Sequence, residues 1–507
     1  MITQNIIGYK LSAQSSKQIF AFDPALMESL PEAFSPATDE EVDIALKKAV
    51  DAWRIFRNMD CRRKASFLNA IADGIEALGD SLVKRMMQET AYSEARVLVE
   101  RRRTCAQLRM YAEFIMNNNW KEVTINHALP DRLPTPRPDL RRMNIPIGPV
   151  IVFAASNFPL AYSTAGGDST SALAAGCPVI VKAHESHLGT NALVAEVIMN
   201  AAKVTGMPDG VFSSLNGDGL ETGKQLVVHP LTAGVGFTGS LTGGRALFDL
   251  GNQRERPIPV FAEMGSVNPV FLLPSAVEKD IESLTVKLVD SMTLTVGQFC
   301  TNPGILIAIK NEDTSNLISK LSNALLKIPA ASMLNENIAR NYHKGVASVK
   351  IEQGITIVSD QPQSENQKAS PILATVHADV FLTRPQLHHE VFGPFSLMVL
   401  CKDFDQILKV AASLEGQLTS TIHATAAEFD HAQALTDVLI EKAGRIIFNG
   451  VPTGVEVCEA MTHGGPYPAS TDSRFTAVGH FAIRRWLRPV TYQDCPEGLL
   501  PEELKER

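Results

Sequence analysis

The chain has 507 residues, which is too long for one hydrophobic core and predicts about three domains. Hydrophobic residues make up 45% and charged residues 20%, as in ordinary soluble globular proteins, and the net charge of −8 argues against a nucleic-acid partner. No apolar run reaches the length of about eighteen residues that a membrane span needs, so we expect no membrane partner.

Cysteine usage indicates the compartment. The seven cysteines are scattered, and none belongs to a C-x-x-C pair. We therefore predict no disulfide framework, no metal site and a reducing, cytoplasmic location. The first residues show no basic segment followed by an apolar run, so we expect no secretion signal.

The segment 38–118 is predicted to be helical. Thr38-Asp39-Glu40-Glu41 matches a capping box, and the apolar residues after it recur at helical spacing. The same spacing continues through residues 62–78, 80–89 and 93–117. The stretch 130–149 is rich in proline and arginine, which excludes a helix and predicts an extended arm or edge ribbon.

From residue 148 onward, short apolar runs alternate with helical segments. Strands are predicted at 150–155, 178–182, 211–215, 235–237 and 260–262, with helices at 165–175, 190–205, 221–228 and 241–250. A second alternating block, from about residue 268 to 450, has apolar runs at 270–273, 304–309, 396–400 and 445–448. Alternation of this kind predicts an α/β fold with two parallel-sheet domains covered on both faces.

Two glycine-rich segments carry the residues of interest. Gly297-Gln298-Phe299-Cys300 places a lone cysteine ahead of an apolar run, and Glu263-Met264-Gly265 offers a carboxylate. A thiol nucleophile and a carboxylate base are what a covalent thioester mechanism needs. Taken singly, the cysteine is also consistent with a buried inert thiol, and the glutamate with a helix-capping or surface position.

Six motifs in order resemble those of the NAD(P)-dependent aldehyde dehydrogenase superfamily, over roughly residues 20–493. They are Ser156-Asn157-Phe158-Pro159, Val181-Lys182, Phe237-Thr238-Gly239-Ser240, Glu263-Met264-Gly265, Gly297-Gln298-Phe299-Cys300 and Glu390-Val391-Phe392-Gly393-Pro394. Within the superfamily, the segments 451–455 and 463–471 look like the α-ketoglutaric semialdehyde (2,5-dioxovalerate) dehydrogenase branch.

The resemblance implies three structural parts. Residues 1–119 and 147–262 would form the NAD(P)-binding domain, and residues 263–465 the catalytic domain. Residues 120–146 and 466–507 would form a small β oligomerisation ribbon and tail. A ribbon exchanged between subunits implies a homodimer or homotetramer.

The resemblance also assigns the catalytic residues. Cys300 would attack the aldehyde carbon, and after hydride transfer the thioester would be hydrolysed by water that Glu263 activates. We expect the apolar neighbours of Glu263 to raise its pKa toward neutrality. Asn157 and the backbone N–H of Cys300 would hold the oxyanion. An Asx turn before Pro159 is the alternative interpretation of Asn157.

Five further residues match cofactor positions of the family. Lys182 and Glu185 would bind the adenosine ribose, Ser240 begins a helix facing the pyrophosphate, and Glu390 and Phe392 would hold the nicotinamide ribose and ring. A carboxylate at position 185 repels a 2′-phosphate, so NAD is favoured over NADP.

The predicted reaction is oxidation of an aldehyde, α-ketoglutaric semialdehyde by preference, to its carboxylate. A fatty or aromatic aldehyde is the alternative substrate, and a catalytically silent scaffold or binding protein is the alternative of another class. CoA-acylating chemistry is disfavoured because Glu263 is present. We hypothesise that Arg102, Arg103 or Arg109 binds a substrate carboxylate; a solvated basic helix face explains them equally well.

Overall fold

The computed structural model describes residues 1–361 and 367–505. Four short strands open the chain: β1 (Asn5–Ile7), β2 (Lys10–Ser12), β3 (Ile19–Asp23) and β4 (Glu28–Phe34). The predicted helical segment follows as α1 (Asp39–Phe56), α2 (Cys61–Ala77), α3 (Gly79–Thr90) and α4 (Glu94–Phe114). The capping box is present, because the Thr38 side chain accepts from the Glu41 N–H while the Glu41 carboxylate accepts from the Thr38 N–H.

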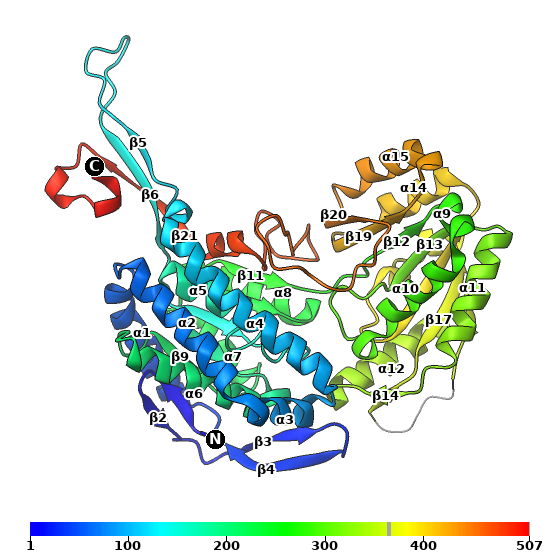
Figure 1. Ribbon diagram of the computed structural model, residues 1–507, viewed down its shortest axis with the longest axis horizontal. Coiled ribbons are helices and arrows are strands. Elements are labelled where there is room, and N and C mark those ends of the chain that lie inside the picture. The colour runs from blue at the N-terminus through cyan, green and yellow to red at the C-terminus, as the bar shows by residue number, and fades with distance from the viewer. Residues whose placement is uncertain (362–366, 506–507) are drawn as a thin grey trace.

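The first large sheet has seven strands in the order β11-β10-β7-β8-β9-β1-β2 (Figure 1). The five strands from β11 to β9 are parallel, and β1 and β2 extend the sheet antiparallel beyond β9. The strands are β7 (Val150–Phe153), β8 (Val179–Lys182), β9 (Phe212–Leu215), β10 (Gly234–Thr238) and β11 (Val260–Glu263), and the helices between them are α5 (Gly167–Ala175), α6 (Leu188–Val204), α7 (Glu221–Val228) and α8 (Leu241–Asn252).

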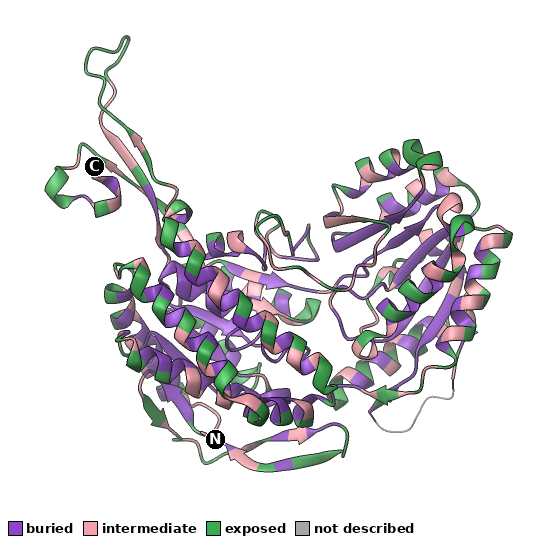
Figure 2. Ribbon diagram, in the orientation of Figure 1, coloured by how far each residue is buried: buried purple, intermediate pink, exposed green. Residues whose placement is uncertain are grey.

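These strands are apolar throughout because successive side chains point to opposite faces of the sheet and both faces are covered. Val150 and Val152 of β7 pack into a cluster with residues of α2 to α6, whereas Ile151 and Phe153 pack with α1, α7 and α8 on the other face. Helices thus cover both faces, and the strands are buried (Figure 2).

The second large sheet has the order β15-β17-β18-β13-β12-β19-β20 and is parallel except for β15. Its strands are β12 (Val270–Leu272), β13 (Ile305–Ile309), β15 (Thr356–Ser359), β17 (Ile372–His377), β18 (Phe395–Cys401), β19 (Gln417–His423) and β20 (Ala443–Phe448). The helices around it are α9 (Pro274–Lys279), α10 (Ile281–Thr293), α11 (Glu312–Leu325), α12 (Glu336–Lys350), α13 (Ala378–Leu382), α14 (Phe404–Ser413) and α15 (Phe429–Leu439). The predicted fold class, two parallel-sheet α/β units, is confirmed.

A separate three-stranded antiparallel ribbon joins β5 (Thr124–Asn126), β6 (Leu140–Pro146) and β21 (Leu487–Gln493). It projects from the body of the molecule (Figure 1). The proline-rich stretch is therefore extended, as predicted, and it pairs with a strand from the far end of the chain. Its role in oligomerisation stays a prediction. Among the described residues, no helix combines the length and apolarity that crossing a membrane requires.

Candidate active site

Cys300 is presented by a strained turn between α10 and β13. Thr295 and Val296 have left-handed φ angles of 52° and 58°, which β-branched residues rarely adopt. Gly297 continues the turn at φ 64°, where an added Cβ would lie 2.4 Å from the backbone of Gly393. Strain of this kind persists only where surrounding contacts hold it, and it is frequent at functional sites.

Asn268 holds this turn in place. Its side-chain amide donates to the carbonyls of Cys300 at 2.8 Å and Asn302 at 2.9 Å. Its side-chain oxygen accepts from the hydroxyls of Ser266 and Thr419 at 2.9 and 3.0 Å. The fully buried Asn268 therefore ties the cysteine turn to the segment that joins β11 to β12.

The structure brings the two predicted chemical groups together, with a third that the sequence analysis did not assign. Glu263 ends β11, and its Oε1 lies 3.0 Å from Nε2 of His463. The same Nε2 lies 3.6 Å from Sγ of Cys300. His463 begins the segment 463–471 that resembles the semialdehyde dehydrogenase branch, and this resemblance was the only signal for it in the sequence.

The charges in this cluster favour a neutral thiol beside an ionised carboxylate. Burial and the adjacent Glu263 carboxylate raise the pKa of Cys300 well above its ordinary value. Burial also acts to raise the pKa of Glu263, but His463 and the Cys300 thiol outweigh it, and the pKa lies below its ordinary value. The expectation of a raised Glu263 pKa is therefore wrong.

The same three side chains place a carboxylate oxygen, a sulfur and a nitrogen within 4.8 Å of one another. A metal would need Cys300 as a thiolate, whereas burial and Glu263 raise its pKa and keep the thiol protonated. The arrangement therefore suits proton transfer better than metal binding. That the chain holds no metal stays a prediction.

Asn157 lies beside the cysteine turn. Its side-chain amide donates to the backbone carbonyl of Gln298 at 3.0 Å, and its backbone carbonyl accepts from the Tyr92 hydroxyl at 3.0 Å. An amide nitrogen carries two hydrogens, so one remains for an oxyanion. Cys300, Glu263 and Asn157 thus occupy one site.

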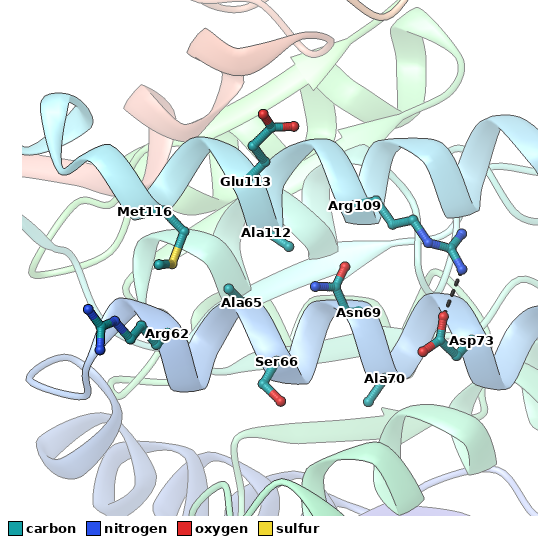
Figure 3. Close-up of a pocket in the computed structure, with 10 residues that line it drawn as sticks. All are labelled: Arg62, Ala65, Ser66, Asn69, Ala70, Asp73, Arg109, Ala112, Glu113 and Met116. Atoms are coloured by element: carbon teal, nitrogen blue, oxygen red, sulfur yellow. Dashed lines mark hydrogen bonds and ion pairs between the residues drawn. The ribbon is translucent and has the colours of Figure 1, made fainter.

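Only one of the three arginines proposed for a substrate carboxylate faces this site. The Arg103 guanidinium lies over the Tyr162 ring, 5.5 Å from its centroid. Arg109 instead forms ion pairs with Asp73 and Glu76. Arg109 and Asp73 line a pocket between α2 and α4, and Figure 3 shows the contact between them. Arg102 is exposed on α4. The positions of Arg102 and Arg109 do not support the hypothesis that either binds a substrate carboxylate.

The predicted adenosine-site residues lie at the carboxyl edge of the first sheet, where such sheets bind ligands. Lys182 ends β8, is buried, and has its Nζ 3.9 Å from Oε1 of the half-exposed Glu185. Ser240 follows β10 and caps α8 by accepting from the Gly243 N–H at 3.2 Å. The three side chains offer the polar groups that a nucleotide ribose and pyrophosphate need.

Glu390 and Phe392 lie in the connection from α13 to β18. The Glu390 carboxylate approaches Gly265, where an added Cβ would lie 2.7 Å from its Oε2. Glu390 therefore lies next to the segment that carries Glu263. Phe392 is two residues away and partly exposed. The cofactor roles of all five residues stay predictions.

Comparison with known proteins gives a consistent result. The sequence model of the aldehyde dehydrogenase family matches residues 11–480. The chain is 47% identical to alpha-ketoglutaric semialdehyde dehydrogenase 2 of Azospirillum brasilense, over 99% of this chain and 96% of that protein. It is 44% identical to alpha-ketoglutaric semialdehyde dehydrogenase of Acinetobacter baylyi, over 93% and 90%.

Solved structures share the fold at low sequence identity. A betaine aldehyde dehydrogenase from Staphylococcus aureus, in complex with NAD⁺, superposes with a TM-score of 0.84 at 17% identity, covering 98% of this chain and 97% of that one. A 1-pyrroline-5-carboxylate dehydrogenase from Thermus with bound NAD gives 0.82 at 20%, covering 97% and 92%. The family model and the two sequence relatives show that this chain belongs to the aldehyde dehydrogenase family.

Proposed function

We propose that the protein oxidises α-ketoglutaric semialdehyde (2,5-dioxovalerate) to α-ketoglutarate with NAD(P)⁺. In this reaction aldehyde, NAD(P)⁺ and water give carboxylate, NAD(P)H and protons. The observation that carries the proposal is the cluster of Cys300, Glu263 and His463 beside Asn157. The substrate is suggested by the two curated relatives, which bear that name and match nearly the whole chain.

Cys300 provides the nucleophile. Its proton passes to Glu263 as sulfur bonds to the aldehyde carbon, because the thiol is protonated at rest and the carboxylate is ionised. Asn157 donates a hydrogen bond to the oxygen that becomes negative, a contribution of about 10²–10³ in rate. When bound, NAD(P)⁺ supplies the acceptor for the hydride.

Glu263 releases the proton taken from Cys300 to solvent and then serves the hydrolytic step. Both of its oxygens are buried, and the described residues give neither a well-aligned hydrogen bond. They remain available to take a proton from water that attacks the Cys300 thioester. His463 positions the Glu263 carboxylate and stabilises its charge.

The residues present fit a dinucleotide. Lys182 and Glu185 offer a donor and an acceptor for ribose hydroxyls, and Glu390 offers a second acceptor next to Gly265. NAD is favoured over NADP because the half-exposed Glu185 carboxylate would repel a 2′-phosphate. The solved relatives with bound NAD support a nicotinamide cofactor.

Assembly and location follow from the same proposal. The projecting ribbon of β5, β6 and β21 would join subunits into a homodimer or homotetramer. The proposed division into a cofactor domain, a catalytic domain and a ribbon is supported by the presence of two large sheets and a small one. All seven cysteines are free, which suits a reducing cytoplasm.

The test is NAD(P)H formation by the purified protein with 2,5-dioxovalerate, hexanal, decanal and benzaldehyde. We expect the highest kcat/KM with 2,5-dioxovalerate, and no turnover by C300S, while the control C61S retains activity because Cys61 lies outside the cluster. A preference for decanal or benzaldehyde would move the enzyme to the fatty or aromatic alternative. No turnover with any aldehyde would favour the silent scaffold.

A further inference from the structure

Arg103 reaches from α4 toward the catalytic cluster. One of its terminal nitrogens donates to the Tyr162 hydroxyl at 3.3 Å, and its guanidinium covers the Tyr162 ring. The Tyr162 ring centroid lies 6.0 Å from that of His463, which contacts Cys300. Arg103, Tyr162 and His463 thus form a continuous series of contacts that ends at the nucleophile.

Charge compensation sets Arg103 apart from Arg96 and Arg109 of the same helix. Arg96 pairs with the buried Glu100 at 2.8 Å and stacks on Phe158. Arg109 pairs with two carboxylates on the other side of the helix. Among the described residues, no carboxylate lies within ion-pair distance of Arg103, and its buried Nε has no hydrogen-bond partner.

A partly buried guanidinium without a counter-ion attracts an anion. Burial without a counter-ion is costly, and the planar donor set of arginine matches a carboxylate with two parallel hydrogen bonds. Nearby groups already respond to its charge. Burial raises the pKa of the Cys300 thiol and of Tyr162, and Arg103 acts on both in the opposite, lowering direction.

Arg445 of β20 supports the neighbouring wall. Its terminal nitrogens donate to the carbonyls of Gly454 at 3.0 Å and Pro452 at 2.7 Å. The loop held in this way carries Val455 and Val457, which pack against the aromatic cluster that contains Tyr162. The terminal nitrogens of Arg445 are thus engaged by this loop, which makes it a positioning residue, although its buried Nε, like that of Arg103, has no partner among the described residues. The terminal nitrogens of Arg103 have only the bond to the Tyr162 hydroxyl, so they are the ones open to a ligand.

We propose that Arg103 binds the carboxylate of the substrate and selects short aldehydes that carry an acid group at the far end. This inference rests on the proposed function and assigns the substrate class to one side chain. Tyr162 orients the guanidinium through its hydroxyl and ring. The apolar side chains around it favour a short methylene chain between the acid and the aldehyde.

The experiment compares R103Q, R103K and the control R102Q, whose altered side chain is exposed on the same helix. Each is assayed with 2,5-dioxovalerate and with pentanal, an uncharged aldehyde of equal length. We expect R103Q to lose roughly 10- to 100-fold in kcat/KM for the acidic aldehyde, chiefly through KM, because a charged hydrogen-bonding partner is removed. Pentanal turnover should change less than about twofold, and R103K should recover part of the loss.

Binding of α-ketoglutarate, measured by calorimetry, provides a readout that needs no turnover and should weaken in R103Q alone. Equal losses with both aldehydes in R103Q would show a structural role and overturn the inference. If R103Q leaves the ratio of kcat/KM for 2,5-dioxovalerate to that for pentanal as it is in the wild type, the inference is overturned as well. If the wild type itself does not prefer the acidic aldehyde, the proposed substrate fails first, and this outcome is separable from a failure of Arg103.

Discussion

His463 Nε2 lies 3.0 Å from Oε1 of Glu263, and both side chains are buried. The two residues are 200 positions apart in the chain, and β11 meets the segment after residue 460 only in the folded protein. An isolated bridge between Glu263 and Ser470, together with the 2.8 Å hydrogen bond from the Met264 N–H to the Ala469 carbonyl, fixes this approach. The base is thus held by a residue from another part of the fold.

Replacing His463 with asparagine should shift the pH dependence of catalysis. Burial alone raises the pKa of Glu263, and His463 is the main group that lowers it, so H463N should raise that pKa. A base works only when deprotonated, so the acidic limb of the kcat profile should move to higher pH. We expect a loss of about tenfold near neutral pH. The control H480N changes a histidine that packs edge-to-face against Phe114. An acidic limb that does not move in H463N would contradict the assignment.

Alkylation of Cys300 should report the charge of Glu263. Because burial and Glu263 raise the pKa of Cys300, iodoacetamide should inactivate the wild type slowly at pH 7 and faster as pH rises above 9. E263Q removes the carboxylate that helps to raise the pKa of Cys300. The curve of inactivation rate against pH should therefore shift to lower pH, with about tenfold faster inactivation at pH 7. Mass spectrometry identifies the labelled thiol. E278Q, an exposed change on α9, should behave as the wild type; identical profiles in E263Q would refute the coupling.

Local sequence determined much of the fold. The capping box at Thr38 and Glu41 formed as predicted because its hydrogen bonds span only three residues. The run Val150–Phe153 formed a strand because both faces of a parallel sheet are covered. The three-residue strands β1 and β2 gave no such signal, since β1 joins the sheet by pairing with β9, about 200 positions away, and β2 joins it only through β1.

In the candidate site too, some features depend on local sequence and others on residues distant in the chain. Cys300 and Glu263 were found from residue type and glycine-rich surroundings. The pKa of Glu263 was predicted in the wrong direction, because its sequence neighbours are apolar while its charged neighbour, His463, arrives through tertiary structure. Helical phase separated Arg103 from Arg102, since adjacent residues on a helix point about 100° apart.

Cofactor choice should depend on Glu185. Its carboxylate lies 3.9 Å from the Lys182 amine at the edge where the adenosine ribose is proposed to bind. E185S would remove the repulsion of a 2′-phosphate and leave the lysine to pair with it, so the ratio of kcat/KM for NADP to that for NAD should rise about tenfold or more. Steady-state kinetics with both cofactors measures this ratio. The nearby exposed change E221Q should leave it unaltered, and no change in E185S would place the ribose elsewhere.

Lys64 should make the free energy of unfolding depend on pH in the alkaline range. It is 2% exposed, its Nζ lies 5.3 Å from the Phe56 ring centroid, and burial lowers its pKa to about 8. The unfolded chain keeps the ordinary value of 10.5, so between these values the unfolded state binds more protons and stability increases with pH. Below pH 8 the buried charge costs about 3 kcal/mol. Cation–π contacts with Phe56 and Trp120 offset part of this cost.

K64M should therefore stabilise the protein by about 1–2 kcal/mol at pH 7, where it removes the buried charge and keeps a side chain of similar shape. At pH 10 the gain should shrink, because the folded wild type then holds a neutral amine at almost no cost. Urea unfolding at the two pH values measures the difference. The control K409M alters an exposed lysine on α14 and should change stability little at either pH. An equal gain for K64M at pH 7 and pH 10 would show that packing, rather than the buried charge, is responsible.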